Sequence, residues 1–153
     1  MIVVSDTSPI TALLTVGAES LLTRLFAEVV IPGAVRDELL RSHSPLPPWL
    51  QVEVVQNFTK VQQFARTVDI GEAEAIELAL ELHADRLLID ERKGRRLASQ
   101  EGIPVIGLLG VVLLSRRQNL IPSARLLLDQ IEREAGMHLD RNLKEAALKT
   151  VNE

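Results

Sequence analysis

The stretch Ile2-Val3-Val4-Ser5-Asp6-Thr7-Ser8-Pro9, at the start of the chain, decides how the rest of the sequence is interpreted. Ile2 to Val4 is a continuous β-branched run, which is typical of a strand buried on both faces of a parallel sheet. Pro9 fits the first turn of a following helix, because an N–H group there has no partner within the helix. Asp6 therefore falls at the carboxyl end of a strand, where open α/β sheets bind their ligands.

Two interpretations of Asp6 are open on this stretch alone. Asp6 is either a functional carboxylate or the capping residue of the next helix, a position that aspartate favours. Thr7 and Ser8 offer hydroxyl groups that can cap the same helix, so Asp6 is not needed for capping. Three more acidic positions downstream favour the functional interpretation.

The composition predicts one globular domain over residues 1–153, with 46% hydrophobic residues and a real core. There are no cysteines, which excludes disulfides, thiolate metal sites and cysteine nucleophiles. His43, His83 and His138 share no ligand spacing, so a histidine metal site is not expected. The chain shows no signal sequence and no membrane-length apolar run, which predicts a cytoplasmic protein without membrane contact. The net charge is −4, and the acidic excess lies in residues 1–85.

Short apolar strands alternate with helical patterns along the whole chain. Strands are expected at residues 2–4, 29–31, 52–55, 87–89 and 104–106. Helices are expected at residues 10–14, 18–26, 32–41, 57–66, 72–83, 92–100, 107–118, 122–135 and 140–150. This alternation predicts an α/β fold: a three-layer α/β/α sandwich with a central parallel sheet.

Four acidic positions lie where strands end or helices begin: Asp6, Glu38, Glu72 and Asp90, with Glu74 and Glu91 as alternatives to the last two. Each has a simpler explanation: Glu72 and Glu74 as favourable charges at a helix N-terminus, Asp90 as a helix cap, and Glu38 as a solvated surface residue. However, the carboxyl ends of parallel strands meet at one edge of a sheet, and the returning helices reach the same edge. The four positions together therefore predict one acidic site.

Converging carboxylates repel one another, so a bound cation is the natural way to keep them ionised. A ligand set made only of oxygen atoms selects Mg²⁺ or Mn²⁺ over Zn²⁺. Such a site hydrolyses phosphodiesters by activating water and by neutralising charge on the phosphoryl oxygens.

These motifs also resemble a known family. They are Val4-Ser5-Asp6-Thr7-Ser8-Pro9, Ile31-Pro32 with Val35-Arg36-Asp37-Glu38-Leu39, Gly71-Glu72-Ala73-Glu74-Ala75-Ile76, and Leu88-Ile89-Asp90-Glu91 with Gly94-Arg95. The chain resembles the PIN-domain nucleases, most closely the subgroup related to VapC-type toxins. The resemblance is clearest over residues 1–135 and leaves the C-terminal helices in 136–153 outside it. It implies a PIN-like α/β/α fold, metal-dependent RNA cleavage and, often, an antitoxin partner.

Matched to the family pattern, the four acidic positions are Asp6, Glu38, Glu72 and Asp90. The third is usually aspartate, and the frequent Thr/Ser-x-Asp before the fourth is Leu88-Ile89-Asp90 in this chain. Ser8 is similar to the small polar residue that the family keeps near its metal.

Basic residues directly follow Asp90, and Arg95 and Arg96 are the candidates for contacting a phosphate, because their helix begins at the site. The sequence therefore predicts an Mg²⁺- or Mn²⁺-dependent endoribonuclease. It leaves open the role of toxin in a toxin–antitoxin pair, and the alternative of a catalytically silent PIN-like module that binds a protein partner. The helix at 107–118 is apolar on all sides, which predicts that part of it lies in a homodimer interface.

Overall fold

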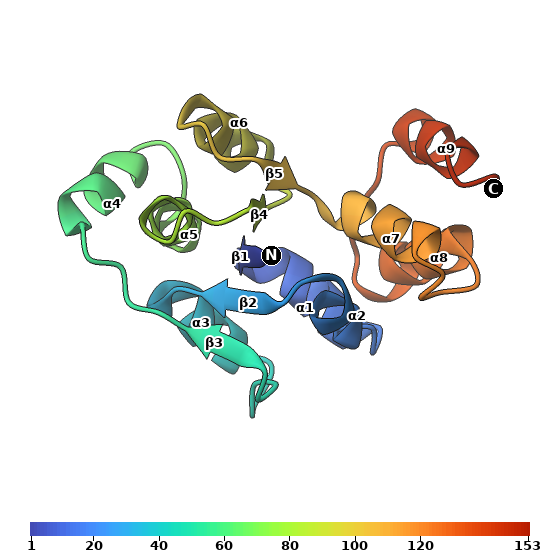
Figure 1. Ribbon diagram of the computed structural model, residues 1–153, viewed down its shortest axis with the longest axis horizontal. Helices are drawn as coiled ribbons and strands as arrows, with labels where there is room; N and C mark the ends of the chain where they lie inside the picture. The colour runs from blue at the N-terminus through green and yellow to red at the C-terminus, as the bar shows by residue number, and fades with distance from the viewer.

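The computed structural model describes residues 1–153 as a five-stranded, all-parallel sheet flanked by nine helices (Figure 1). The elements in chain order are β1 (Ile2–Ser5), α1 (Thr7–Thr15), α2 (Ser20–Leu25), β2 (Glu28–Ile31), α3 (Gly33–Leu40), β3 (Leu50–Val52), α4 (Phe58–Phe64), α5 (Ile70–Glu81), β4 (Arg86–Leu88), α6 (Arg92–Gln100), β5 (Val105–Ile106), α7 (Leu108–Arg117), α8 (Ala124–Glu134) and α9 (Arg141–Lys149). The predicted α/β sandwich with a central parallel sheet is confirmed.

The first strand of the chain is also the central one, because the strand order is β3-β2-β1-β4-β5. Val3 pairs with Val29 of β2 on one side and with Arg86 of β4 on the other. Val3 and Val4 are both fully buried, each in a separate hydrophobic core on its own side of the sheet. The β-branched run is therefore buried on both faces, as the sequence predicts for a central parallel strand.

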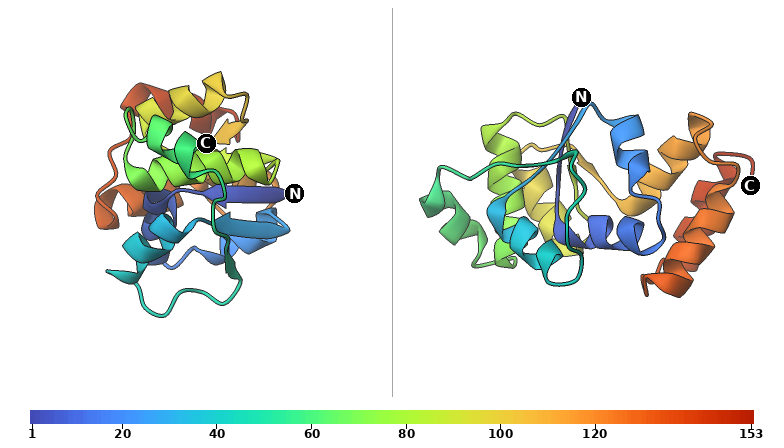
Figure 2. Two further views of the ribbon diagram at one scale, coloured as in Figure 1. Left: turned by 90° about the vertical axis from the view of Figure 1, so that its left-hand side faces the viewer. Right: turned by 90° about the horizontal axis from the view of Figure 1, so that it is seen from below.

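Helices cover both faces of the sheet (Figure 2). The first core lies under α1, α2, α7 and α8, and contains the fully buried Leu13 and Val111. The second core lies under α4, α5 and α6, and contains Ile76 of α5 and Ala98 of α6. α3 begins directly after β2 and contacts both α1 and α5. These contacts place α3 where the two helical layers approach each other.

The carboxyl ends of β1, β2 and β4 lie at one edge of the sheet because the strands are parallel. The amide of Asp6 donates a hydrogen bond to the carbonyl oxygen of Leu88 at 2.9 Å, which joins the chain beyond β1 to the end of β4. Residues that follow these strands therefore start from neighbouring points.

The third strand lies earlier in the chain than the predicted 52–55. β3 spans Leu50–Val52, and Leu50 pairs with Val29. Val55 is buried in the second core without belonging to a strand. The apolar pattern therefore identified a buried segment, but pairing with β2 set the bounds of the strand.

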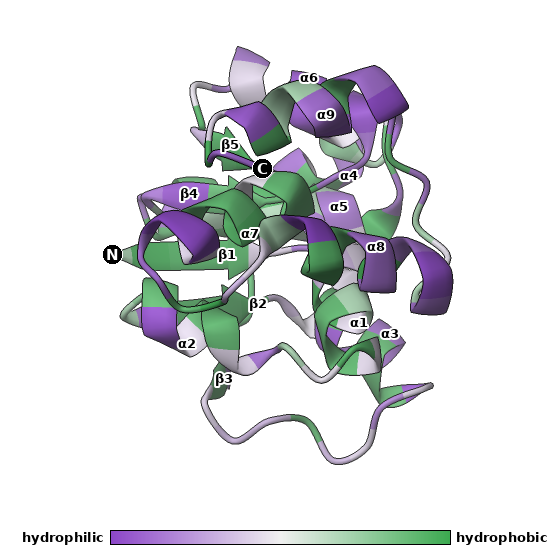
Figure 3. Cartoon of the chain, turned by 90° about the vertical axis from the view of Figure 1, so that its right-hand side faces the viewer, coloured by the Kyte–Doolittle hydropathy of each residue, from purple (hydrophilic) through white to green (hydrophobic).

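α7 is covered within the chain. Leu108, Val111 and Val112 are buried, and the helix contacts α2, α8 and α9. Figure 3 shows α7, largely coloured as hydrophobic, in the midst of these helices. Its apolar surface therefore does not by itself require a second copy of the chain, and the homodimer stays a prediction. No helix of the structure has both the length and the apolar character needed to cross a membrane.

Candidate active site

Asp6 directly follows β1 and occupies the N-cap position of α1, but its carboxylate makes no capping hydrogen bond to the helix. The residue is only 7% exposed. Burial raises the pKa of Asp6 from 3.8 to about 7. The nearby amide of Thr7 opposes this shift, whereas the negative charges of Asp69, Glu38 and Asp90 reinforce it. Capping therefore does not explain why an aspartate is buried here.

Glu72 lies in the first turn of α5, which Asp69 caps. Oδ1 of Asp69 accepts a hydrogen bond from the amide of Glu72 at 2.8 Å. Glu72 is 6% exposed, and its Oε2 is buried without a hydrogen-bond partner. Burial raises the pKa of Glu72 to about 8, and the neighbouring carboxylate of Asp69 and the charges of Asp6 and Glu91 add to the shift. Glu72 is thus a buried acid with an unsatisfied oxygen.

Two glycines make room for carboxylates of the site. A Cβ atom at Gly94 of α6 would lie 2.6 Å from Oε2 of Glu72, closer than real contacts allow. A Cβ atom at Gly71 of α5 would lie 2.5 Å from Oε1 of Glu38 and 3.5 Å from Oδ1 of Asp69. The carboxylate of Glu38, which comes from α3, therefore lies against the first turn of α5, next to Asp69. The positive end of the α5 helix dipole is a favourable place for the negative charges of Glu38 and Asp69.

Asp90 and Glu91 follow β4 and have different surroundings. Oδ1 of Asp90 accepts a hydrogen bond from the amide of Leu108 at 2.9 Å, at the start of α7, while its Oδ2 is buried without a partner. Burial raises the pKa of Asp90, and the Leu108 amide and the Arg95 guanidinium oppose the shift. Glu91 is exposed at the N-cap position of α6 and makes no capping hydrogen bond.

A cavity of about 400 Å³ opens among these side chains. Its lining residues are Asp6, Thr7, Ser8, Thr11, Ala12, Glu38, Asp69, Glu72, Glu91, Ala135 and Met137. Five of them carry carboxylates and three carry hydroxyl groups, but none is lysine, arginine or histidine. The cavity is therefore strongly acidic and rich in oxygen ligands.

A protein-family model matches almost the whole chain. Residues 2–153 match DUF3368, a family described as a PIN domain. The chain belongs to this PIN-domain family. No curated protein sequence matches the chain. PIN domains are generally nucleases, which supports a hydrolase activity in general. The match confirms the predicted PIN resemblance but does not assign the chain to the VapC-related subgroup.

PIN domains typically use divalent metal ions, and the donor set of this cavity fits such an ion. The ligands that Mg²⁺ and Mn²⁺ prefer are carboxylate and hydroxyl oxygens. Oε2 of Glu72 and Oγ1 of Thr7 are buried without partners, and neighbouring negative charges add to the raised pKa values of Asp6 and Glu72. A bound cation would give the unpartnered oxygens a ligand and would offset the repulsion between the carboxylates. As arranged, however, no three acidic or histidine side chains are close enough together to hold a metal ion. The carboxylates surround the cavity without converging on one point.

The structure brings three of the four predicted acids to one cavity: Asp6, Glu38 and Glu72. Asp90 does not line it, although its charge contributes to the pKa of Asp6, and the lining carboxylate from this segment is Glu91. The alternative at the third position, Glu74, is engaged elsewhere: its Oε1 accepts a hydrogen bond from the amide of Ala34 at 3.0 Å, in the first turn of α3. Glu72 and Glu74 therefore have separate tasks.

Of the three residues predicted to contact substrate, one lines the cavity and two do not. Ser8 is exposed and lines the cavity. Arg95 does not line it, because its Nη1 donates a hydrogen bond to the carbonyl oxygen of Ile89 at 2.9 Å, next to Gly107. Arg96 is exposed on α6 and does not line it either. In this structure Arg95 holds the end of β4, and contact of either arginine with a phosphate stays a prediction.

Sequence reasoning missed Asp69 and the residues that follow α8. Asp69 precedes Glu72 by three residues, the spacing of a helix-capping box, and that signal could have identified it. Ala135 and Met137 carry no such signal, since only the folding of α8 against α1 brings them to the cavity.

Proposed function

We propose that this PIN domain is an Mg²⁺- or Mn²⁺-dependent endoribonuclease that hydrolyses phosphodiester bonds in RNA. The observation that carries the proposal is a cavity lined by five carboxylates and by no basic side chain. A phosphodiester is itself an anion, so this cavity repels it unless a cation is present. When bound, the cation supplies neutralisation of the phosphate charge and a more acidic water for in-line attack.

The chain's own residues have distinct tasks in this proposal. Asp6, Glu38 and Glu72 would hold the cation, which requires their side chains to move closer together than they are as arranged. Ionisation of the two buried acids, Asp6 and Glu72, becomes favourable once the cation binds. The hydroxyl groups of Ser8 and Thr11 donate hydrogen bonds to phosphate or ribose oxygens. Asp90 acts from behind the cavity: it fixes the start of α7, and its charge adds to the negative field around Asp6.

RNA is the proposed substrate class because the motifs resemble those of RNA-cleaving PIN domains. The resemblance to VapC-type toxins also motivates a role as the toxin of a toxin–antitoxin pair, which an antitoxin protein would then bind.

A second candidate is a catalytically silent PIN-like module that binds a protein partner. The observation in its favour is the spread of the carboxylates, of which no three are positioned to hold a metal ion. The two candidates differ in one property, because only the nuclease requires the cavity to take up a divalent cation.

Cleavage of labelled RNA separates the candidates. We expect cleavage with Mg²⁺ or Mn²⁺, none with a chelator, and products that carry a 5′-phosphate. Asp6→Asn should abolish cleavage, whereas Asp37→Asn is the matched control, since Asp37 is an exposed carboxylate on α3 next to Glu38 in the chain. Cleavage that persists in the chelator, or in Asp6→Asn, would refute the metal-dependent mechanism. A lack of any cleavage over a broad RNA panel would favour the silent module.

A further inference from the structure

The link between α8 and α9, residues 135–140, forms one wall of the acidic cavity. Ala135 and Met137 of this link are cavity-lining residues, together with Asp6 and Glu72 from distant parts of the chain. Besides Ala12, they are the only apolar side chains in the lining. Met137 is much the largest of the three. The apolar surface offered to anything in the cavity therefore comes chiefly from Met137.

The link is held in place by packing. Ala135, Met137 and Leu139 are partly buried against the first core, and Ile131, in the last part of α8, is fully buried there. Gly136, between the two lining residues, has a φ of +66°, a conformation that favours glycine. The turn that leads from α8 to Met137 is thus specified by the sequence.

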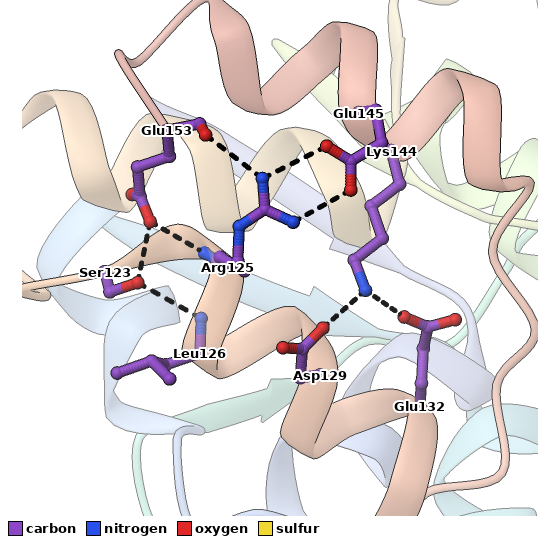
Figure 4. A network of polar contacts seen from close by, with 8 residues as sticks. All are labelled: Ser123, Arg125, Leu126, Asp129, Glu132, Lys144, Glu145 and Glu153. Carbon is purple, nitrogen blue, oxygen red and sulfur yellow. Dashed lines mark hydrogen bonds and ion pairs between the residues drawn. The ribbon is translucent and has the colours of Figure 1, made fainter.

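Ion pairs fasten α9 back onto α8 (Figure 4). The ammonium group of Lys144 in α9 contacts the carboxylates of Asp129 and Glu132 in α8. Arg125 at the start of α8 forms a two-pronged pair with Glu145, at 2.8 and 3.1 Å. Each such pair contributes little when exposed, but together they join the two helices along their length. The link is therefore fixed at both of its ends.

We propose that Met137 is a specificity-determining residue, against which the base of the nucleotide next to the reacting phosphate packs. This inference rests on the proposed nuclease function and adds the substrate contact to it. A nucleotide joins an anionic phosphate and a polar ribose to a flat, largely apolar base. The carboxylates and hydroxyl groups of the cavity match the first two through a cation and hydrogen bonds, and only Met137 offers a sizeable apolar surface to the third.

The chemistry of methionine defines the selectivity that follows. Its side chain is unbranched and polarisable, so it adapts to different partners and makes favourable contacts with aromatic rings. It forms no strong directional hydrogen bonds with base edges. Met137 therefore selects by area of contact, which favours the larger purine rings over pyrimidines without reading one sequence.

The chain allows a direct test, because it contains only two methionines, Met1 and Met137. Met1 is 61% exposed and precedes β1, so its side chain serves as an internal control. In protein labelled with ¹³C at the methionine methyl groups, Mn²⁺ should broaden the Met137 signal much more than the Met1 signal. Uniform broadening, or none at Met137, would contradict the proposed metal site itself.

The base contact is tested with Mg²⁺ and three ligands that cannot be cleaved: adenosine 5′-monophosphate, uridine 5′-monophosphate and ribose 5-phosphate. We expect the adenosine nucleotide to shift the Met137 signal most, the uridine nucleotide less, and ribose 5-phosphate least. If ribose 5-phosphate shifts it as much as the nucleotides, or if no ligand shifts it although Mn²⁺ broadens it, the base contact is refuted while the metal site stands.

Variants test the same contact in RNA cleavage. Met137→Gln should raise KM about fivefold, the effect of losing roughly 40 Å² of apolar contact, and leave kcat within about twofold. Met137→Leu keeps an apolar side chain of similar size and should restore the wild-type KM. Leu143→Ala removes an exposed apolar side chain of α9 that does not line the cavity, and should not change KM. An unchanged KM in Met137→Gln, or an equal rise in Leu143→Ala, overturns the proposal.

Discussion

Replacing Asp6 by asparagine is expected to stabilise the metal-free protein at neutral and alkaline pH. The wild-type side chain is 7% exposed, and its pKa is raised from 3.8 to about 7. An acid with a raised pKa binds its proton more tightly in the folded state, so wild-type stability falls as the pH rises between these two values. Asparagine has a similar shape and does not ionise, so the variant does not lose this part of the stability.

The size of the effect follows from the shift. About three pKa units at about 1.4 kcal/mol each correspond to an upper limit of about 4 kcal/mol at pH 8. Some of this will be lost to relaxation around the charge, which leaves roughly 2–4 kcal/mol. For a domain of this size that is a rise in Tm of roughly 5–15 °C. The difference between Asp6→Asn and wild type should shrink toward zero near pH 4.

The assay is thermal unfolding of both proteins in chelator at several pH values between 4 and 8, repeated with Mg²⁺ or Mn²⁺. The added cation should raise the Tm of the wild type and close most of the gap, and it should affect Asp6→Asn much less. A variant that is less stable than wild type at pH 8, or a difference that does not depend on pH, would refute the reasoning and restore a structural role for Asp6.

Three further outcomes are expected. Glu72→Gln should remove far more cleavage activity than Glu74→Gln, because a glutamine at position 74 can still accept the hydrogen bond from the amide of Ala34 in α3. Equal losses in kcat/KM would contradict the assignment of Glu72, rather than Glu74, to the site. Gly94→Ala should lower the free energy of unfolding by about 1–3 kcal/mol and impair cleavage, because the added Cβ would lie 2.5 Å from Ile89 and 2.6 Å from Glu72. Denaturant unfolding measures the change, and a variant more stable than wild type, as is usual for glycine to alanine in a helix, would exclude this crowding. Light scattering over a micromolar dilution series should show the predicted homodimer, and a constant mass of 16.9 kDa would rule it out.

The sequence was sufficient to predict the parallel sheet and most of the segments that contribute acidic residues to the cavity. A buried β-branched strand followed by an acid, and a helix that starts at an acid, are local signals. The residues that these signals single out, Asp6 and Glu72, both line the cavity. Glu38 lines the cavity too, because α3 begins directly after β2 and packs against both α1 and α5. The bounds of β3 were wrong because pairing with a neighbouring strand, which no local pattern encodes, defines an edge strand.

The rest of the site depends on single-residue geometry and on distant parts of the chain. Asp90 and Glu91 are adjacent in sequence but have different surroundings after β4. Asp90 accepts a hydrogen bond at the start of α7 and lies outside the cavity lining, whereas Glu91 is part of the lining. Spacing cannot distinguish the two, because a turn has no fixed period. Met137 could not be predicted for a different reason. It lies after α8 in a link without any motif, and it lines the same cavity as Asp6 only because α8 packs on α1.

The raised pKa values of Asp6 and Glu72, about 7 and about 8, have a consequence for how the cavity would be loaded. A divalent ion that binds as proposed would have to displace the protons that these acids hold below their raised pKa values, and would release them to the buffer. Its uptake would then be an exchange of protons for an ion, and the apparent affinity would fall as the pH is lowered. Protons and metal would thus compete for the same two carboxylates.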